Sequence, residues 1–460
     1  MSNRHFSDIL QNQFHSAVSN PELNLIRHLK KVHGSESQLV STTICTEALF
    51  PLEEYLKSIG THPDPVSDES YYTFDFAKDK NEQAVFPRIS AGILEFMYEN
   101  TPFRVYIASW TCGYNDYCFY GLVFTASTDD VGRELASEVY KYGSALKEEI
   151  WVYEGGEWAK SSVLFHAIKR SAWEDVILDE QLKEDLRRDT QTFFESKEVY
   201  GALGITWKRG LLLMGPPGNG KTETIKALLN KFGYAALYVK SFSTPFQGPE
   251  HGIRLIFNHA RKHAPCVLIL EDLDSMVTPK VRSYLLNELD GLAQNSGILT
   301  IATTNHPERI DDAILNRPSR FDVKYEFGLP SLDLRKRFAL RWVDKVQSSN
   351  TAASSGEGLM FGDGEGDRIA GEVAKRTEGW SFAFLKELFV SYLLRLAHDR
   401  SLRKSKIDTA NVNPHLEDVL MDQIERLSAQ ILKLQASAGK DSVEEDDHDE
   451  DSSSSSDSHN

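Results

Sequence analysis

Short apolar runs alternate with helix-like segments through the middle of the chain. The runs lie at Leu211–Met214, Ala235–Val239, Val267–Leu270, Leu299–Ala302 and Val323–Phe327. Helical patterns separate the first four runs, and a helix followed by an arginine-bearing loop precedes the fifth. Strands that alternate with helices predict a parallel sheet with both faces covered. We therefore expect an α/β core over residues 166–330.

The pattern before this core differs, because strands follow one another there without long helices between them. Two strand-like runs, a helical pattern and a hairpin pattern occupy, in order, Phe103–Trp110, Tyr117–Ala126, Val131–Glu149 and Ile150–Lys160. Phe6–His33 has the pattern of one or two helices, interrupted near Asn20-Pro21. Together they predict an N-terminal α+β domain over residues 1–165. Trp173–Tyr200 has the pattern of a connecting strand and a long helix leading into the core.

The chain becomes helical after Pro330. Helical patterns lie at Ser331–Lys345, Ile369–Thr377, Ser381–Ala397 and Glu417–Ala436, which predicts a helical region over residues 331–437. A stretch rich in Gly, Ser and Ala interrupts it, so we expect a disordered insertion over residues 348–367. Serine and acidic residues dominate residues 438–460, which we expect to form a disordered, solvated tail.

One stretch in the core has the composition of a phosphate-binding loop. It reads Gly215-Pro216-Pro217-Gly218-Asn219-Gly220-Lys221-Thr222 and lies between an apolar run and a helical pattern that opens at Glu223. Glycines let backbone N–H groups turn towards a phosphate, and a helix N-terminus adds positive potential. We expect residues 215–223 to bind a nucleoside triphosphate, with Lys221 on the β- and γ-phosphates and the Thr222 hydroxyl on Mg²⁺.

Two adjacent acids supply what hydrolysis requires beyond phosphate binding. Glu271 and Asp272 directly follow the apolar run Val267–Leu270, 50 residues beyond Lys221. Carboxylates at the end of a buried strand can hold Mg²⁺ and orient an attacking water. An acidic turn after a core strand is the structural alternative, and the phosphate loop upstream favours the catalytic interpretation.

The net charge of −17 is concentrated at the C-terminus, where nine acids and no lysine or arginine lie in residues 441–460. The rest is only mildly acidic, which argues against non-specific nucleic-acid binding. A short basic cluster could contact phosphates or direct nuclear import, but such clusters more often form solvated helix ends. Its members are Arg400, Arg403, Lys404 and Lys406.

Targeting and redox signals are weak in this sequence. The four cysteines show no metal-ligand spacing, so reduced thiols are the default. No apolar run reaches the ~18 residues of a membrane helix, and the first residues lack a signal-peptide core. We expect a soluble intracellular protein of the cytoplasm or nucleus.

From about Trp173 to His398 the chain resembles the AAA family of ATPases, motif by motif. Besides the phosphate loop and the acid pair, Thr303-Thr304-Asn305 is similar to the family's first sensor, and Gly379–Leu385 to the second-sensor region of a helical lid. Asp312–Asp322 is similar to the second region of homology. The resemblance implies a P-loop NTPase core with a C-terminal helical lid, and ATP and Mg²⁺ as ligands.

The resemblance also assigns roles to single residues. Asn305 would help place the attacking water, while Arg317 and Arg320 would be arginine fingers that reach the nucleotide of a neighbouring subunit. Fingers that act in trans imply a homo-oligomeric ring, expected to be hexameric. Phe246-Gln247-Gly248 stands where the family places its pore loop, although Gln247 replaces an apolar residue and Pro249 follows.

The acid pair departs from the family's usual order of Asp followed by Glu. Here Glu271 precedes Asp272, an order that occurs in the branch containing the mitochondrial Rieske-protein translocase. By position, Glu271 would hold the Mg²⁺ water shell and Asp272 would act on the attacking water. Asp is one methylene shorter than Glu, so its carboxylate lies roughly 1.5 Å further back unless the backbone compensates.

These observations favour an ATP-hydrolysing ring that remodels or unfolds protein clients, with the N-terminal domain selecting the client or adaptor. The alternative is a nucleotide-gated assembly scaffold that hydrolyses ATP slowly or not at all, because its acid pair is inverted. A nucleic-acid motor is a third hypothesis. Retention of Asn305, Arg317 and Arg320 favours the first, since a chain without catalysis is not expected to hold the complete set.

Overall fold

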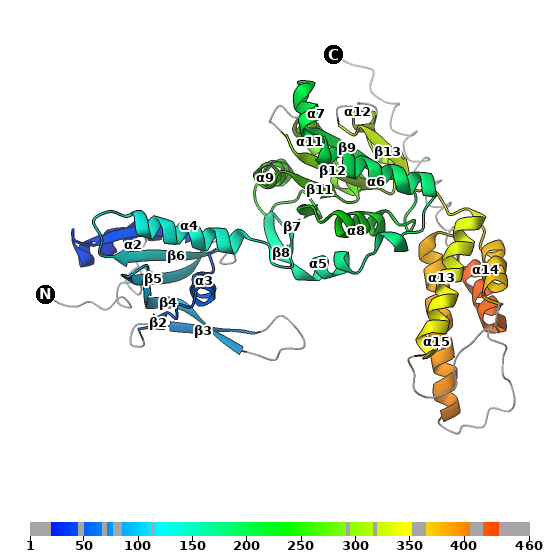
Figure 1. Cartoon of the computed structure of the whole chain (residues 1–460), viewed down its shortest axis with the longest axis horizontal. Coiled ribbons are helices and arrows are strands. Elements are labelled where there is room, and N and C mark those ends of the chain that lie inside the picture. The colour runs from blue at the N-terminus through cyan, green and yellow to red at the C-terminus, as the bar shows by residue number, and fades with distance from the viewer. Residues whose placement is uncertain are drawn as a thin grey trace, which may run out of the picture. The chain divides into compact units, whose positions relative to one another are not determined.

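The computed structural model describes residues 20–44, 50–66, 71–76, 85–112, 115–290, 295–315, 320–351, 365–404 and 417–431. Contacts divide the chain into two compact units, Met1–Lys147 and Glu148–Asn460. Both are drawn in Figure 1. Among the residues described, no helix combines the length and the apolarity needed to cross a membrane.

The first unit is built on an antiparallel sheet with the strand order β1-β6-β5-β4-β2, and β3 pairs with β4. Its strands are β1 Gln38–Ile44, β2 Asp64–Pro65, β3 Tyr71–Phe76, β4 Val85–Tyr98, β5 Thr101–Cys112 and β6 Asn115–Phe124. The two strands expected from their Val, Ile, Tyr and Phe content are therefore present as β5 and β6. The strands β1 to β4 were not predicted from the sequence, although β3 is also rich in Tyr and Phe.

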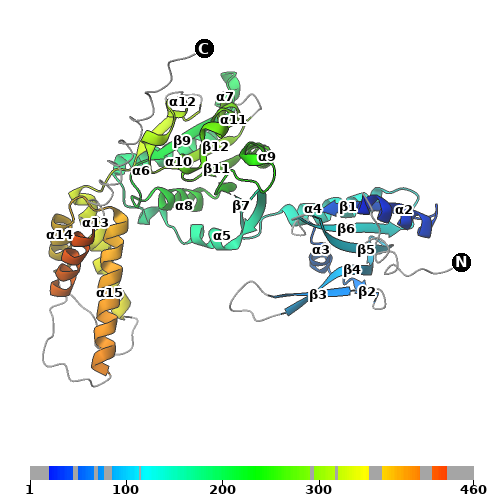
Figure 2. The same cartoon turned by 180° about the vertical axis from the view of Figure 1, so that it is seen from behind.

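Helices cover both faces of this sheet (Figure 2). On one face, Leu25 and Leu29 of α2 (Pro21–His33) pack near Phe119. On the other, α3 (Leu52–Ser58) and α4 (Asp130–Ser144) pack over a core that includes Phe124. The helix expected from Val131 thus ends at Ser144, and the part of the expected N-terminal helices before residue 20 lies outside the described residues.

The second unit contains a seven-stranded sheet in the order β13-β9-β12-β11-β10-β7-β8. All neighbouring pairs are parallel except the β7–β8 hairpin. The strands are β7 Ile150–Glu154, β8 Glu157–Ser161, β9 Lys208–Met214, β10 Ala236–Val239, β11 Cys266–Leu270, β12 Ile298–Thr304 and β13 Val323–Glu326. All five strands expected from the apolar runs are confirmed, and so is their parallel pairing.

Alternate strand residues point to opposite faces of the sheet. Leu211 and Leu213 of β9, with Val267 and Ile269 of β11, face a core closed by α5, α6 and α8. Beyond β11, α9 contacts both that strand and α11. The helices are α5 Ser162–Lys169, α6 Glu180–Glu195, α7 Lys197–Ala202, α8 Lys221–Phe232, α9 Gly248–His263, α10 Leu273–Met276, α11 Pro279–Asp290 and α12 Asp312–Leu315.

The boundary between the units falls earlier than the sequence indicated. Residues 148–165 were expected to close the N-terminal domain, but the hairpin within them belongs to the second sheet. Its first strand, β7, runs parallel to β10, with Leu237 opposite Trp151 and Val239 opposite Tyr153. Tyr153 is fully buried there. The hairpin pattern is local, whereas its partner strand lies over 80 residues away in the sequence, so only the tertiary structure could assign it.

The segment expected as a connecting strand before α6 is instead a 3₁₀ turn, Trp173–Asp175. It buries Trp173 against the core shared by α6 and α8. Asp179 then caps α6, because its carboxylate accepts hydrogen bonds from the N–H groups of Gln181 and Leu182. The turn thereby brings Asp175 close to the phosphate loop at the end of β9.

A separate helical layer follows β13. It consists of α13 Leu332–Thr351, α14 Glu365–Arg376, α15 Phe382–Lys404 and a further helix over residues 417–431, packed around one apolar core. The insertion expected over residues 348–367 is shorter at both ends, because α13 continues to Thr351 and α14 begins at Glu365. The rest of that expected insertion and the expected tail at 438–460 lie outside the described residues.

Candidate nucleotide-binding site

The expected phosphate loop lies between β9 and α8, in the context that the sequence predicted. Gly215, Gly218 and Gly220 have φ values of 141°, 79° and 92°, a region that side-chain-bearing residues rarely adopt. Gly215 also has no room for a side chain, since an added Cβ would lie 2.2 Å from the backbone oxygen of Phe327. Two independent constraints therefore require glycine at the end of β9.

Lys221 is the first residue of α8 and is 7% exposed. Its Nζ donates to the carbonyl oxygens of Gly215 at 2.5 Å and Pro216 at 3.0 Å. Burial lowers the pKa of Lys221, while the nearby carboxylates of Asp272, Asp274 and Glu271 oppose that shift. The two carbonyl oxygens thus hold the ammonium group over the loop. They would compete only weakly with a phosphate, which is a stronger, charged acceptor.

Asp272 and Asn305 meet at the carboxyl edge of the sheet. They follow the neighbouring parallel strands β11 and β12, and Asn305 Nδ2 donates to Asp272 Oδ1 at 2.8 Å. The Asp272 backbone is left-handed, with φ 52° and ψ 54°, and its N–H donates to Thr303 Oγ1 at 3.0 Å. A non-glycine residue held in this conformation is strained, and such strain is typical of functional sites.

Asp274 supports this arrangement, although the sequence assigned it no role. Its Oδ1 accepts hydrogen bonds from Thr304 Oγ1 at 2.8 Å and from the Asn305 N–H at 3.2 Å. It thereby fixes the backbone that presents Asn305. The sequence does show a third acid two positions after Asp272. Its partners at the end of β12 are distant in the sequence, so the sequence alone did not reveal the contact.

Glu271 is held on the side away from Asp272, by a hydrogen bond that the Tyr238 hydroxyl donates to its Oε2. Its other oxygen, Oε1, is buried and accepts no hydrogen bond from the described part of the chain. A buried carboxylate oxygen without a partner is costly, and Mg²⁺ prefers oxygen ligands, many of them waters. The chemistry of Glu271 therefore fits a residue that holds Mg²⁺, as the sequence suggested, and Thr222 stays a predicted ligand.

A pocket of about 590 Å³ opens above the loop. Its walls are the loop itself, Asp272 and Asn305, the segment 170–178, and the lid helices α13 and α15. The lid touches the loop directly, because the N–H of Ala383 donates to the oxygen of Gly218 at 3.0 Å. A Cβ on Gly218 would lie 2.6 Å from the Ala383 Cβ, so this glycine also permits the lid to close on the loop.

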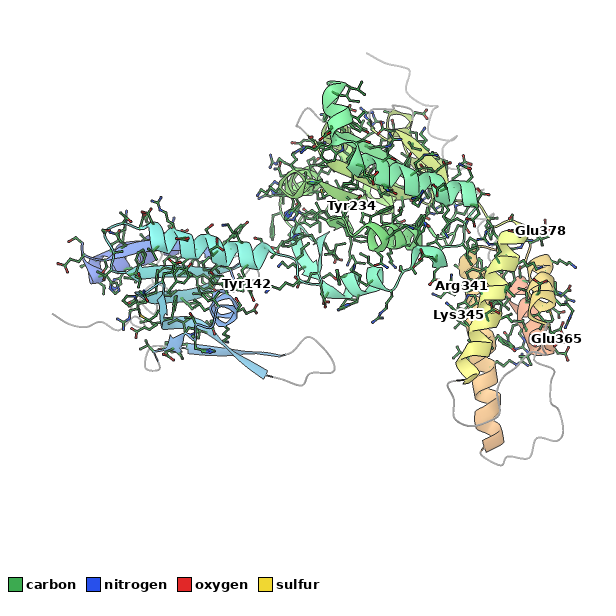
Figure 3. The ribbon with its side chains drawn as sticks, viewed as in Figure 1. Tyr142, Tyr234, Arg341, Lys345, Glu365 and Glu378 are labelled. Atoms are coloured by element: carbon green, nitrogen blue, oxygen red, sulfur yellow. The ribbon has the colours of Figure 1, made fainter. Side chains whose placement is uncertain are left out.

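A second contact joins the lid to the opposite rim of the pocket. Arg341 of α13 forms an ion pair with the Asp175 carboxylate and donates to the Asp175 carbonyl oxygen at 2.5 Å. Arg341 and Lys345 both project from α13 in Figure 3, and both line the pocket. The sequence did not predict this contact, since an arginine in a helical pattern carries no signal for a partner over 160 residues away.

Of the two expected arginine fingers, only Arg320 lies within the described residues, whereas Arg317 lies outside them. Arg320 is 7% exposed, and its guanidinium pairs with both oxygens of Asp290 in α11, at 3.0 and 2.8 Å. It also donates to the Ala313 carbonyl oxygen. Within this one chain the guanidinium of Arg320 therefore faces Asp290, and its role as a finger stays a prediction. The motif could not reveal this pairing, because Asp290 comes from a different helix.

Arg320→Ala is expected to lower the free energy of unfolding by about 2–4 kcal/mol, because it removes the buried partner of Asp290. Arg282→Ala is the matched control, since its pair with Asp311 is largely exposed and should contribute less than about 1 kcal/mol. Urea denaturation of both variants would measure the difference. If the two variants were equally stable, the pair between Arg320 and Asp290 would not stabilise the fold, and Arg320 would remain available as an arginine finger.

Comparison with known proteins gives a family match over the segment that carries the phosphate loop. Residues 211–329 match the sequence profile of the family described as ATPase family associated with various cellular activities (AAA). The chain is 33% identical over 233 residues to the ATPase family gene 2 protein of Saccharomyces cerevisiae, across 48% of this chain and 28% of that protein. It is 34% identical over 232 residues to the ATP-dependent zinc metalloprotease FTSH 6, chloroplastic, of Arabidopsis thaliana, across 47% and 31%.

The fold and the phosphate loop define a P-loop nucleotide-binding protein of the α/β class. More narrowly, the chain carries an ATPase domain of the AAA family, and ATP hydrolase is the enzyme class of that domain. The family resemblance and the fold class predicted from the sequence are confirmed. The chain spans less than a third of the length of either relative, so the match concerns this domain and not the whole of those proteins.

Proposed function

We propose that this chain binds ATP with Mg²⁺ and hydrolyses it in a ring of identical subunits, expected to be hexameric, in order to remodel or unfold protein clients. The observation that carries the proposal is the contact between Asp272 and Asn305 in the same pocket as Lys221. It joins an acid, a polar sensor and a phosphate-binding cation, which are the parts that phosphoryl transfer to water requires.

Each residue of the site has a separate task in this proposal. Bound Mg²⁺ would neutralise charge on the β- and γ-phosphates, and Thr222 and Glu271 would hold it. Lys221 would bind the phosphates. Asp272, with one oxygen held by Asn305, would keep its second oxygen for a hydrogen bond from the attacking water. The acids thus retain the roles expected from their positions, despite their inverted order.

The ring and its clients are also part of the proposal. The AAA family match supports assembly of this kind, and Arg317 is the residue that we assign as the finger in trans. Phe246 is 64% exposed immediately before α9, which suits a loop that touches a client in the pore. The first unit, with its two-sided antiparallel sheet, would select the client or its adaptor.

The test of this function uses two inactive variants. Lys221→Ala cannot bind nucleotide but keeps Arg317, whereas Arg317→Ala keeps its own site. In a ring with fingers in trans, a mixture should hydrolyse ATP although each variant alone does not, and turnover of the unsubstituted chain should rise cooperatively with protein concentration. ATP binding without turnover in any mixture would favour the nucleotide-gated scaffold. Activity of Arg317→Ala alone would exclude a finger role for Arg317.

A further inference from the structure

Tyr238 lies one strand away from the acid pair and forms a hydrogen bond with its first member, Glu271. It is on β10, opposite Ile269 of the parallel strand β11, and Glu271 follows that strand directly. Its hydroxyl donates a hydrogen bond to Glu271 Oε2. A phenol carries its proton at physiological pH and can therefore donate this hydrogen bond.

The two acids are consequently tethered to different neighbours. Glu271 is bound towards β10 by Tyr238, whereas Asp272 is bound towards β12 by Asn305. Asp272 is exposed and lines the nucleotide pocket, while Glu271 is partly buried and is not among the lining residues. Each hydrogen bond therefore holds its carboxylate towards a different neighbouring strand.

The tether also distinguishes the two oxygens of Glu271. Oε2 is engaged by Tyr238, and Oε1 is buried with no donor from the described residues. A carboxylate with one oxygen fixed in this way has one defined oxygen left for a cation or a water that a cation binds. Partners of this kind set the orientation of metal ligands, and losing one typically costs about 10- to 100-fold in metal affinity.

We propose that Tyr238 is a positioning residue for Mg²⁺: it holds Glu271 by Oε2 so that Oε1 serves the metal and its water shell. The inference rests on the metal role assigned to Glu271 in the proposed function. It adds a residue from a neighbouring strand, outside the phosphate loop, the acid pair and the sensors. It also provides a physical reason why the inverted acid pair keeps its division of labour.

Tyr238→Phe tests this inference because it removes only the hydroxyl. The variant should bind ATP in EDTA with unchanged affinity. Mg²⁺ should still increase the affinity for ATP, but the Mg²⁺ concentration that gives half of this increase should rise about tenfold. The readout is the fluorescence of a labelled ATP analogue titrated with MgCl₂, measured in the Asp272→Asn background so that hydrolysis does not interfere. In the hydrolysing chain, saturating Mg²⁺ should restore most of kcat.

Two controls separate positioning from a general effect on the fold. Tyr325→Phe makes the same change on β13, where the hydroxyl donates to Asp189 Oδ2 at 2.8 Å, and it should leave the Mg²⁺ titration unchanged. Glu271→Gln should by itself raise the Mg²⁺ concentration that is needed. Adding Tyr238→Phe should change it little further, because the effects of two substitutions at one contact are not additive.

The outcomes are distinct. The inference would be supported if Tyr238→Phe raised the half-effect Mg²⁺ concentration about tenfold, Tyr325→Phe left it unchanged, and Tyr238→Phe had little further effect in the Glu271→Gln background. No shift, or a shift of equal size in the Glu271→Gln background, would overturn it. If the unsubstituted chain bound ATP in a Mg²⁺-dependent manner but did not hydrolyse it, the proposed function would fail, while the binding titration would still decide the role of Tyr238.

Discussion

Asp272→Asn is expected to reduce ATP turnover by about 100- to 10,000-fold, the usual contribution of a positioned acid–base group, while ATP affinity stays within a few-fold. Asparagine tolerates the left-handed backbone that Asp272 adopts at φ 52°. Its side-chain oxygen can also still accept from Asn305. The substitution therefore removes the charge and leaves the geometry intact. Steady-state turnover and nucleotide binding, measured on the same preparation, would separate the two effects.

The comparison variant for this prediction is Glu271→Gln. It should raise the Mg²⁺ requirement rather than stop the reaction, because Glu271 holds the metal side of the proposed site. If Glu271→Gln instead stopped turnover at every Mg²⁺ concentration while Asp272→Asn hydrolysed ATP normally, the roles of the two acids would be reversed.

Lys221→Ala is expected to weaken ATP binding by over about 100-fold, which corresponds to roughly 3 kcal/mol for a lost charge-assisted contact. Lys221 is buried at the loop, and its ammonium is already directed at the loop carbonyls. Isothermal titration calorimetry would measure the affinity. The stabilisation that ATP gives the unsubstituted chain in thermal denaturation should be lost as well.

Lys226→Ala is the matched control for that substitution. Lys226 lies on the same helix, but it pairs with Glu223 at 2.9 Å and does not line the pocket, so its removal should leave ATP affinity within about twofold, as for a surface pair. Unchanged affinity in Lys221→Ala would refute the assignment of residues 215–223 as the phosphate-binding loop.

Local sequence patterns predicted the phosphate loop and the strands of the second sheet. The backbone conformations at Gly215, Gly218 and Gly220 require glycine. Such a requirement depends only on the neighbouring residues, so a local motif can reveal it. The apolar runs are strands because parallel strands are buried on both faces. The resemblance assigned Asp272 and Asn305 to the same attacking water, and the structure adds that they follow neighbouring parallel strands.

The tertiary structure decided what depends on partners far away in the chain. It placed the hairpin over residues 150–161 in the second sheet, because a local hairpin pattern does not show which sheet the hairpin joins. It paired Arg320 with Asp290, a contact that the motif could not reveal because Asp290 lies in a different helix. It also joined Tyr238 to Glu271 and Arg341 to Asp175. The sequence by itself therefore determined the elements and the chemistry of the loop, whereas long-range packing determined which charges meet.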